Sequence, residues 1–229
     1  ATPSSPSQVS SVNLSGNQSV LGLTVSGSYL YAVRQTSNGD DFFALSLSSP
    51  NNPTVSGSTD LGTSGNEVAV IGNYAYVATG DNTSEVISVS ISTPSSPSVS
   101  GSTNITGNSD AVTIAALGSY LIVGQDGSGN MQILDTPSSA TSPTVTGTYT
   151  AGSPINDLDV DPDNNLVFLA TNETTAEFQV IDVSTPSSPS LAGSIDASND
   201  LNGVAYSVDN AIAICVGDTN NQEVTLFGS

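Results

Sequence analysis

The sequence predicts an all-β fold, a five-bladed β-propeller with four antiparallel strands in each blade, and three observations support this. A Pro-x-x-Pro phrase recurs along the chain at regular spacing. Short apolar segments separated by turn residues fill the intervals between its copies. No segment shows the apolar spacing of about 3.6 residues that an amphipathic helix requires. Repeats of roughly 45 residues, each with four strands, are typical of propeller blades.

The recurring phrase sets the period. The second prolines of its five copies are Pro6, Pro53, Pro97, Pro143 and Pro189. Their spacing is 47, 44, 46 and 46 residues, so the repeats begin near residues 3, 50, 94, 137 and 186. The 40 residues after Pro189 and the first 6 residues together make up one further period of 46. We therefore expect a single domain over residues 1–229 whose two ends belong to one blade.

The second repeat shows the four strands most clearly. Residues 68–71 and 74–78 are joined by Gly72-Asn73, a pair that tolerates the positive φ of a tight hairpin. Residues 85–91 alternate apolar and polar side chains, and residues 98–102 are mostly Ser and Gly, as an outer edge strand should be. The second segment of each repeat is almost continuously apolar, which indicates a strand buried on both faces.

Residues 1–16 are expected to supply the closing outer strand of the last blade. Residues 7–14 carry the apolar side chains Val9, Val12 and Leu14, and the blade they complete contains residues 203–208, 211–216 and 223–227. The same strand suits donation to a neighbouring copy, because main-chain bonds to an open sheet edge give affinity and alternate side chains fix register. Donation that does not close into a ring produces a polymer. The sequence leaves self-closure and strand exchange open.

Composition narrows the partners and the location. The chain has one Lys or Arg, 21 Asp or Glu and no His, for a net charge of −20. It therefore repels nucleic acids and anionic lipid surfaces, and no run of about 18 apolar residues is present for membrane insertion. Richness in Ser and Thr with no Lys favours an extracellular or cell-surface protein. The expected partners are further copies of the chain or cell-surface glycans.

Few residues are available for catalysis. Without His or Lys, Ser-His-Asp chemistry and His-based zinc sites are excluded, and Cys215 lies in an apolar strand where a buried thiol is expected. A pair of carboxylates for glycoside hydrolysis remains, from Glu67, Asp110, Asp157 and Asp159 near the starts of inner strands. No Trp is available to stack on a sugar, and the loops are short. We expect no enzymatic activity and no required cofactor.

Acidic residues also suggest a cation. Glu67, Asp110 and Asp157 fall at similar points of three repeats and would ring one mouth of the channel, where oxygen ligands suit calcium. Asp161 and Asp163 lie in an acidic turn that lacks the ligand spacing of an EF-hand. The simpler interpretation is solvated carboxylates and an Asx turn.

The lone arginine and the Asn-x-Ser/Thr sites are the remaining residues of interest. Arg34, the lone strong base, is expected to form a structural salt bridge to Asp40 or Asp41. The Asn-x-Ser/Thr sites that could accept glycans are Asn13, Asn17, Asn82, Asn104 and Asn172.

The repeat resembles the LVIVD family of propeller repeats. The resemblance lies in residues 72–78, which read Gly-Asn-Tyr-Ala-Tyr-Val-Ala, and in residues 180–189, which begin Val-Ile-Asp-Val and end in Pro-Ser-Ser-Pro. It extends over essentially the whole chain, with the first and last repeats the most divergent. The resemblance implies a propeller fold and a secreted or surface-attached protein. It brings no catalytic residues.

These observations predict a non-enzymatic extracellular structural or adhesive surface protein. Closure of the last blade by the chain's own N-terminal strand is the favoured arrangement, and self-assembly through exchange of that strand is the alternative. The alternative is a secreted, lectin-like glycan-binding propeller, which should expose Tyr or Phe in equivalent pockets between blades. A carboxylate-based glycoside hydrolase is less favoured, and it would need two acids facing each other roughly 5 to 10 Å apart.

Overall fold

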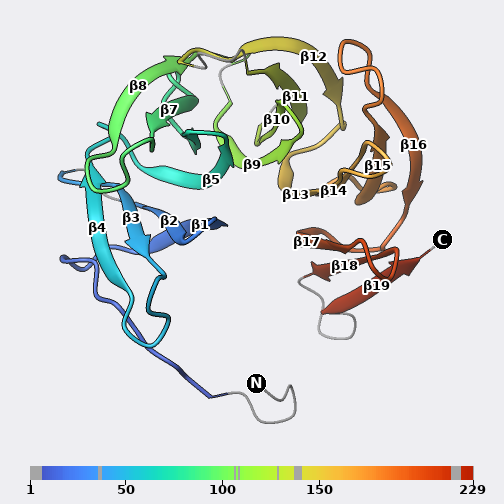
Figure 1. The fold of residues 1–229 in the computed structure, drawn as a ribbon. Coiled ribbons are helices and arrows are strands. Elements are labelled where there is room, and N and C mark those ends of the chain that lie inside the picture. Colours follow the sequence, from blue (N-terminus) through green and yellow to red (C-terminus); the bar gives the residue numbers. More distant parts are fainter. Residues whose placement is uncertain are drawn as a thin grey trace.

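The computed structural model describes residues 7–35, 38–105, 107, 109–127, 129–136, 141–217 and 223–228. In this part of the chain all regular structure is β, and the strands form five antiparallel sheets. The sheets stand side by side around an arc, with the first strand of each at its inner side (Figure 1). The predicted all-β class and the division into five sheets are confirmed.

Each sheet corresponds to one repeat and is called a blade. Blade 1 contains β1 (Val20–Ser26), β2 (Tyr29–Arg34), β3 (Phe42–Ser46) and β4 (Thr54–Thr59). Blade 2 contains β5 (Gly65–Ile71), β6 (Tyr74–Thr79), β7 (Val86–Ser90) and β8 (Ser98–Thr103). Blade 3 contains β9 (Ala111–Leu117), β10 (Tyr120–Gln125), β11 (Asn130–Asp135) and β12 (Thr144–Thr150). Blade 4 contains β13 (Ile155–Asp161), β14 (Leu166–Thr171), β15 (Phe178–Asp182) and β16 (Ser190–Ile195). Blade 5 contains β17 (Leu201–Ser207), β18 (Ile212–Gly217) and β19 (Val224–Gly228).

The turn residues explain why the first two strands of each blade pair tightly. Gly72 has a φ of 60° between β5 and β6, where Ile71 pairs with Tyr74. Gly27 and Gly118 take the same conformation in blades 1 and 3, and Asn165 and Ala211 have positive φ in blades 4 and 5. Residues that enter this region of φ at low cost therefore fix the hairpin register in the first three blades.

The hydrophobic core lies between neighbouring blades. Successive residues of a second strand point in opposite directions, one toward the preceding blade and one toward the following blade. Tyr76 packs toward blade 3, whereas Val77 packs toward blade 1, and neither has exposed surface. The apolar second strands predicted from the sequence are thus buried because blades cover both of their faces.

Blade 5 differs from the others in lacking an outer strand. Its sheet contains β17, β18 and β19, and the described residues 7–19 form no strand. Figure 1 shows the arc open between blade 5 and blade 1, with the N-terminal segment running along blade 1. The expected pairing of Val9, Val12 and Leu14 with the last blade is therefore not formed within this chain. Val12 and Leu14 instead pack on Ala32, Phe43 and Leu45 of blade 1.

No helix long and apolar enough to cross a membrane occurs in the described part of the chain.

Candidate assembly site

An acidic residue just before the third strand fixes the linker that follows the outer strand. The carboxylate accepts a hydrogen bond from a backbone N–H 20 residues later, which ties the end of the blade to its middle. The bonds are Leu61 N to Asp41 Oδ2 (3.2 Å), Ile105 N to Glu85 Oε2 (3.0 Å) and Ala197 N to Glu177 Oε2 (2.8 Å). Glu223 holds this position in blade 5, and its side chain is exposed.

A glycine near the middle of each outer strand lets the next blade approach closely. A Cβ on Gly57 would lie 2.7 Å from the carbonyl oxygen of Pro94, and one on Gly147 would collide with the carbonyl of Pro186. Each contact is made with the Pro-x-x-Pro loop of the following blade. Gly193 of β16 occupies the same position in blade 4, and a Cβ there would meet no atom of the described residues within 4 Å.

The N-terminal segment, defined here as residues 7–16, has the features of an outer strand. Leu14 follows its repeat proline by the same number of residues as Leu61 follows Pro53. Leu14 packs on Ala32, Phe43 and Leu45 of blade 1, and Leu61 packs in the core with Val77, Ile87 and Val89, the equivalent residues of blade 2. Ser10 stands at the glycine position, and its hydroxyl donates to the carbonyl of Pro50 at 2.9 Å. The segment is therefore placed on blade 1 as β4 is placed on blade 2.

Arg34 fastens this segment. Its Nη1 donates to the carbonyls of Leu14 (2.8 Å) and Ser15 (2.7 Å), its Nε donates to the carbonyl of Asp40 (2.9 Å), and its guanidinium lies 4.7 Å from the centroid of the Phe43 ring. The predicted salt bridge to the Asp40 or Asp41 carboxylate is replaced by these contacts. Two of these carbonyls belong to the N-terminal segment, which crosses blade 1 at this point, and the third belongs to Asp40 just before β3.

The open side of blade 5, its forward face, is formed by side chains whose counterparts are buried elsewhere. Ile214 is 39% exposed, Val216 42%, Val224 60% and Leu226 61%. The counterparts of Val224 face the following blade and are at most 3% exposed; they are Phe42, Val86, Met131 and Phe178. The forward face of blade 5 thus has the composition of an interface between blades, but no other blade of the described chain packs against it.

The rear face of blade 1 is only half covered. The N-terminal segment covers its second and third strands, but Leu23 and Val25 of β1 are 63% and 59% exposed. The residues equivalent to Leu23 are at most 8% exposed, and they are Val68, Ile114, Leu158 and Val204. The two ends of the arc therefore present complementary halves of the same repeated interface.

The inner-strand acids proposed as cation ligands bond to the backbone of the next blade. Glu67 Oε2 accepts from Ile114 N at 2.8 Å, and Asp157 Oδ2 accepts from Val204 N at 2.9 Å. Asp159 Oδ2 likewise accepts from Tyr206 N at 2.7 Å. Burial raises the pKa of both Glu67 and Asp157, the bonds to the backbone oppose it, and neighbouring acids add to the rise. The sequence analysis did not predict this role. The acid and the amide that it binds are 47 residues apart in each of the three bonds, about one repeat, and that spacing could have indicated the contact.

The remaining cation candidates are not brought together with these acids. Asp110 lies beside Asp126, which together with burial raises the pKa of Asp110. Asp161 accepts from Asp163 N and from the Asn164 side chain in an Asx turn, and the Asn164 bond lowers its pKa. Among the described residues no three acidic or cysteine side chains are grouped as metal ligands. Calcium binding stays a prediction. The contacts of Asp161 are those of an Asx turn.

Cys215 and the candidate glycan acceptors occupy different environments. Cys215 has no exposed surface, and burial, with a further contribution from Asp157, raises its pKa to about 12. Asn13, Asn17, Asn82 and Asn104 are exposed, whereas Asn172 is half-buried and its Oδ1 accepts from Asn156 Nδ2 at 2.6 Å. Exposure leaves the first four sites accessible to modification.

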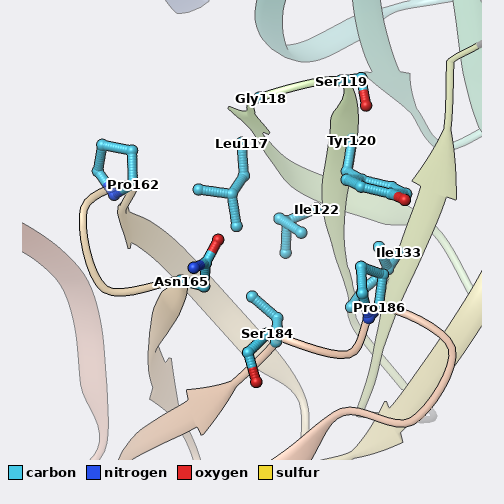
Figure 2. Close-up of a pocket in the computed structure, with 11 residues that line it drawn as sticks. Leu117, Gly118, Ser119, Tyr120, Ile122, Ile133, Pro162, Asn165, Ser184 and Pro186 are labelled. Carbon is cyan, nitrogen blue, oxygen red and sulfur yellow. The ribbon is translucent and has the colours of Figure 1, made fainter.

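A pocket of about 450 Å³ lies between blades 3 and 4, next to the hairpin turns. Figure 2 shows the Tyr120 ring on one side of it and Asn165, Ser184 and Pro186 on the other. Tyr29 and Tyr74 hold the position of Tyr120 in blades 1 and 2, and all three are partly exposed. Partly exposed tyrosines thus recur at equivalent positions, and the lectin-like alternative stays a prediction.

Comparisons with known proteins agree with the repeat and the architecture. The family model described as the LVIVD repeat matches residues 62–105, 108–151 and 171–197. No curated protein matches the chain.

Solved structures share the fold at low sequence identity. The structure of a mitotic checkpoint complex aligns with a TM-score of 0.74 and 13% identity, over 96% of this chain and 64% of that one. The β-propeller domain of Cps50 (Swd1) from Myceliophteria thermophila aligns with a TM-score of 0.71 and 14% identity, over 91% and 68%. A functionally unknown protein from Desulfotomaculum acetoxidans aligns with a TM-score of 0.72 and 13% identity, over 92% and 68%. This chain therefore spans about two thirds of each matched chain.

Proposed function

The chain belongs to the LVIVD-repeat family, and from this premise we propose that it is a non-enzymatic extracellular structural protein whose copies join head to tail by N-terminal strand exchange. The N-terminal segment of one copy becomes the fourth strand of blade 5 in the next copy. β19 offers an unpaired edge, and edges of this kind are extended by added strands. The contact is heterologous, so its repetition yields a polymer.

The observation that carries the proposal is the complementarity of the two ends. Blade 5 has three strands and an exposed acid at the linker position, Glu223, whereas the N-terminal segment has outer-strand features and no sheet of its own. By equivalence with Leu61 and Asp41, the backbone N–H of Leu14 would bond to the Glu223 carboxylate. The forward face of blade 5 would then cover Leu23 and Val25 on blade 1 of the copy that donates its N-terminal segment.

Exchange fits this geometry better than self-closure does. The N-terminal segment already lies on blade 1 where the outer strand of a preceding blade would lie. A second copy can bring its β19 alongside the segment without moving either chain internally. Self-closure requires the arc to tighten until blade 5 reaches blade 1 of the same chain (Figure 1). Bending the arc strains blade interfaces that are fixed by packing and by the bonds from Glu67, Asp157 and Asp159.

Composition supports the extracellular, structural part of the proposal. A chain of net charge −20 without Lys or His lacks the usual bases of enzymes and repels polyanions. Its inner-strand acids are engaged with backbone amides, which leaves them poorly placed as hydrolytic pairs.

Sizing the intact chain beside a form lacking residues 1–16 tests the proposal. Strand exchange predicts that the intact chain forms concentration-dependent polymers and that the shortened form is monomeric. Glu223→Ala should weaken assembly, because the Leu14 N–H then loses its acceptor. Self-closure predicts monomers in both cases, with a lower melting temperature for the shortened form.

Glycan binding is a second candidate, favoured by the pocket at Tyr120. Its partly exposed ring lines the same pocket as Asn165 and Ser184, and this combination of a stacking surface with polar groups suits a neutral sugar. Binding of the intact chain to a panel of neutral glycans should be lost in Tyr120→Ala. No binding in any glycan class would remove this candidate.

A further inference from the structure

A second pocket, between blades 4 and 5, is unlike its counterparts at the other blade junctions. It has a volume of about 460 Å³ and is lined by Phe178, Val180, Gly193, Tyr206, Phe227 and Gly228, among others. The rings of Phe178 and Phe227 stack with centroids 4.6 Å apart. The lining is therefore aromatic and apolar, with a glycine from β16 at its edge.

The corresponding place at the other junctions is filled by a Pro-x-x-Pro loop. At the junction of blades 1 and 2, Gly57 lies against Pro94 and Pro97. At the junction of blades 3 and 4, Gly147 lies against Pro186 and Pro189. Gly193 is the equivalent glycine at the junction of blades 4 and 5, and no atom of the described residues lies within 4 Å of the Cβ position there. The pocket thus has the shape of a site for such a loop, and none of the described residues fills it.

The geometry points to Pro3-Ser4-Ser5-Pro6 of a second copy as the occupant of this pocket. This assignment rests on the strand exchange proposed above. The pocket would bind the residues of the donated segment that come just before its strand. In blades 1, 2 and 4 the Pro-x-x-Pro phrase directly precedes the outer strand, and in blade 3 the longer phrase at residues 137–143 does so. If residues 7–12 pair with β19, Pro3–Pro6 must pass over the end of β19, at Phe227 and Gly228. Proline-rich segments bind aromatic grooves with little loss of entropy, because their backbone is already extended.

The apolar lining also discriminates among segments. The phrase at residues 3–6 carries no charge, which matches a lining dominated by Phe178, Val180 and Phe227. Moving a charged side chain into such a site is unfavourable, because the charge loses its water and gains no partner. The acidic surface of the chain is therefore excluded as an alternative occupant. Residues 1–6 lie outside the described residues, so the assignment depends on the pocket and on the repeat.

Substitution of Gly193 provides a test in the full-length chain. Gly193→Val leaves the single chain unstrained, because its Cβ position is open. It should block the loop, because the equivalent Cβ on Gly57 would lie 2.7 Å from a loop carbonyl. Ala192→Val, on the exposed neighbouring residue of the same strand, is the matched control. Sedimentation velocity should show polymers for wild type and Ala192→Val, and at least tenfold weaker association for Gly193→Val.

A mixing experiment identifies the source of the loop. A Pro3→Asp/Pro6→Asp variant keeps its pocket but places charge in the phrase, and should be monomeric alone. Mixed with Gly193→Val, whose phrase is intact, it should form heterodimers and no longer species.

Three results would overturn the inference in distinguishable ways. Unchanged assembly of Gly193→Val would reject the pocket and leave strand exchange standing. A wild-type chain that is monomeric at every concentration would reject strand exchange and the second-copy loop together. Monomers in the mixture, despite a polymeric wild type, would show that each chain fills its own pocket.

Discussion

Truncation of Leu226 is the most direct test of the interface between copies. The side chain is 61% exposed in the single chain, whereas its counterpart Ile133 is 1% exposed between blades 3 and 4. Full burial of a leucine is worth about 1.5–3 kcal/mol, so covering the exposed part contributes about 1–2 kcal/mol. Since 1.4 kcal/mol is a factor of ten, Leu226→Ala should weaken each junction about tenfold. Adding Val224→Ala, at 60% exposure, should bring the loss to about a hundredfold.

The stability of the single chain serves as the internal control. Because Leu226 contacts little within its own chain, its truncation should lower the melting temperature by less than about 2 °C. Leu191→Ala is the matched substitution: Leu191 is 49% exposed on β16, and its counterparts Val55, Val99 and Val145 are exposed in blades 1, 2 and 3. Sedimentation velocity over a concentration series gives the association constant, and calorimetry gives the melting temperature. Equal association for Leu226→Ala and Leu191→Ala would refute the assignment of the forward face as an interface.

Three further predictions concern charge, pH and the thiol. Assembly should strengthen when NaCl is raised from 0.1 to 1 M in a sedimentation series, because copies of net charge −20 repel and the screening length falls from about 10 to 3 Å. Burial raises the pKa of Asp41 from 3.8 to about 6, so the stability that its proton confers is complete below about pH 4 and is lost as the pH rises through 6. Asp41→Asn should therefore melt higher than wild type at pH 7 and lose part of the gain that wild type shows on acidification; a wild-type melting temperature that falls steadily from pH 7 to 5 would contradict this. Cys215, buried with its pKa raised to about 12, should resist a thiol reagent at pH 8 until the chain is denatured, and rapid reaction in the native state would mean that blade 5 opens.

The repeat architecture was predictable because its signals are local. The prolines mark the links, Gly72 and its equivalents mark the hairpins, and continuous apolar runs mark strands covered on both faces. The outer-strand character of residues 7–14 was also evident from Val12 and Leu14. The sequence did not indicate which sheet this strand joins, because the same residues suit blade 5 of their own chain and blade 5 of another copy.

The roles of single polar residues escaped prediction because they depend on contacts far along the chain. The sequence predicts a salt bridge between Arg34 and a neighbouring carboxylate. In the structure Arg34 instead donates to the carbonyls of Leu14 and Ser15, about 20 residues away in the sequence. Glu67 and Asp157 resembled cation ligands because their backbone partners come into range only when blades stack. The sequence shows that these acids recur at equivalent positions, but only the structure shows which groups they bind.

The bonds from inner-strand carboxylates to the amides of the adjoining blade have an evolutionary consequence. Each such bond depends on one side chain alone, since its donor is main chain and is present whatever residue stands there. A duplicated repeat that carries the acid would find its donor in any neighbour, without a compensating change elsewhere. The array can therefore gain, lose or diversify units by single genetic events, each product being held together from the start.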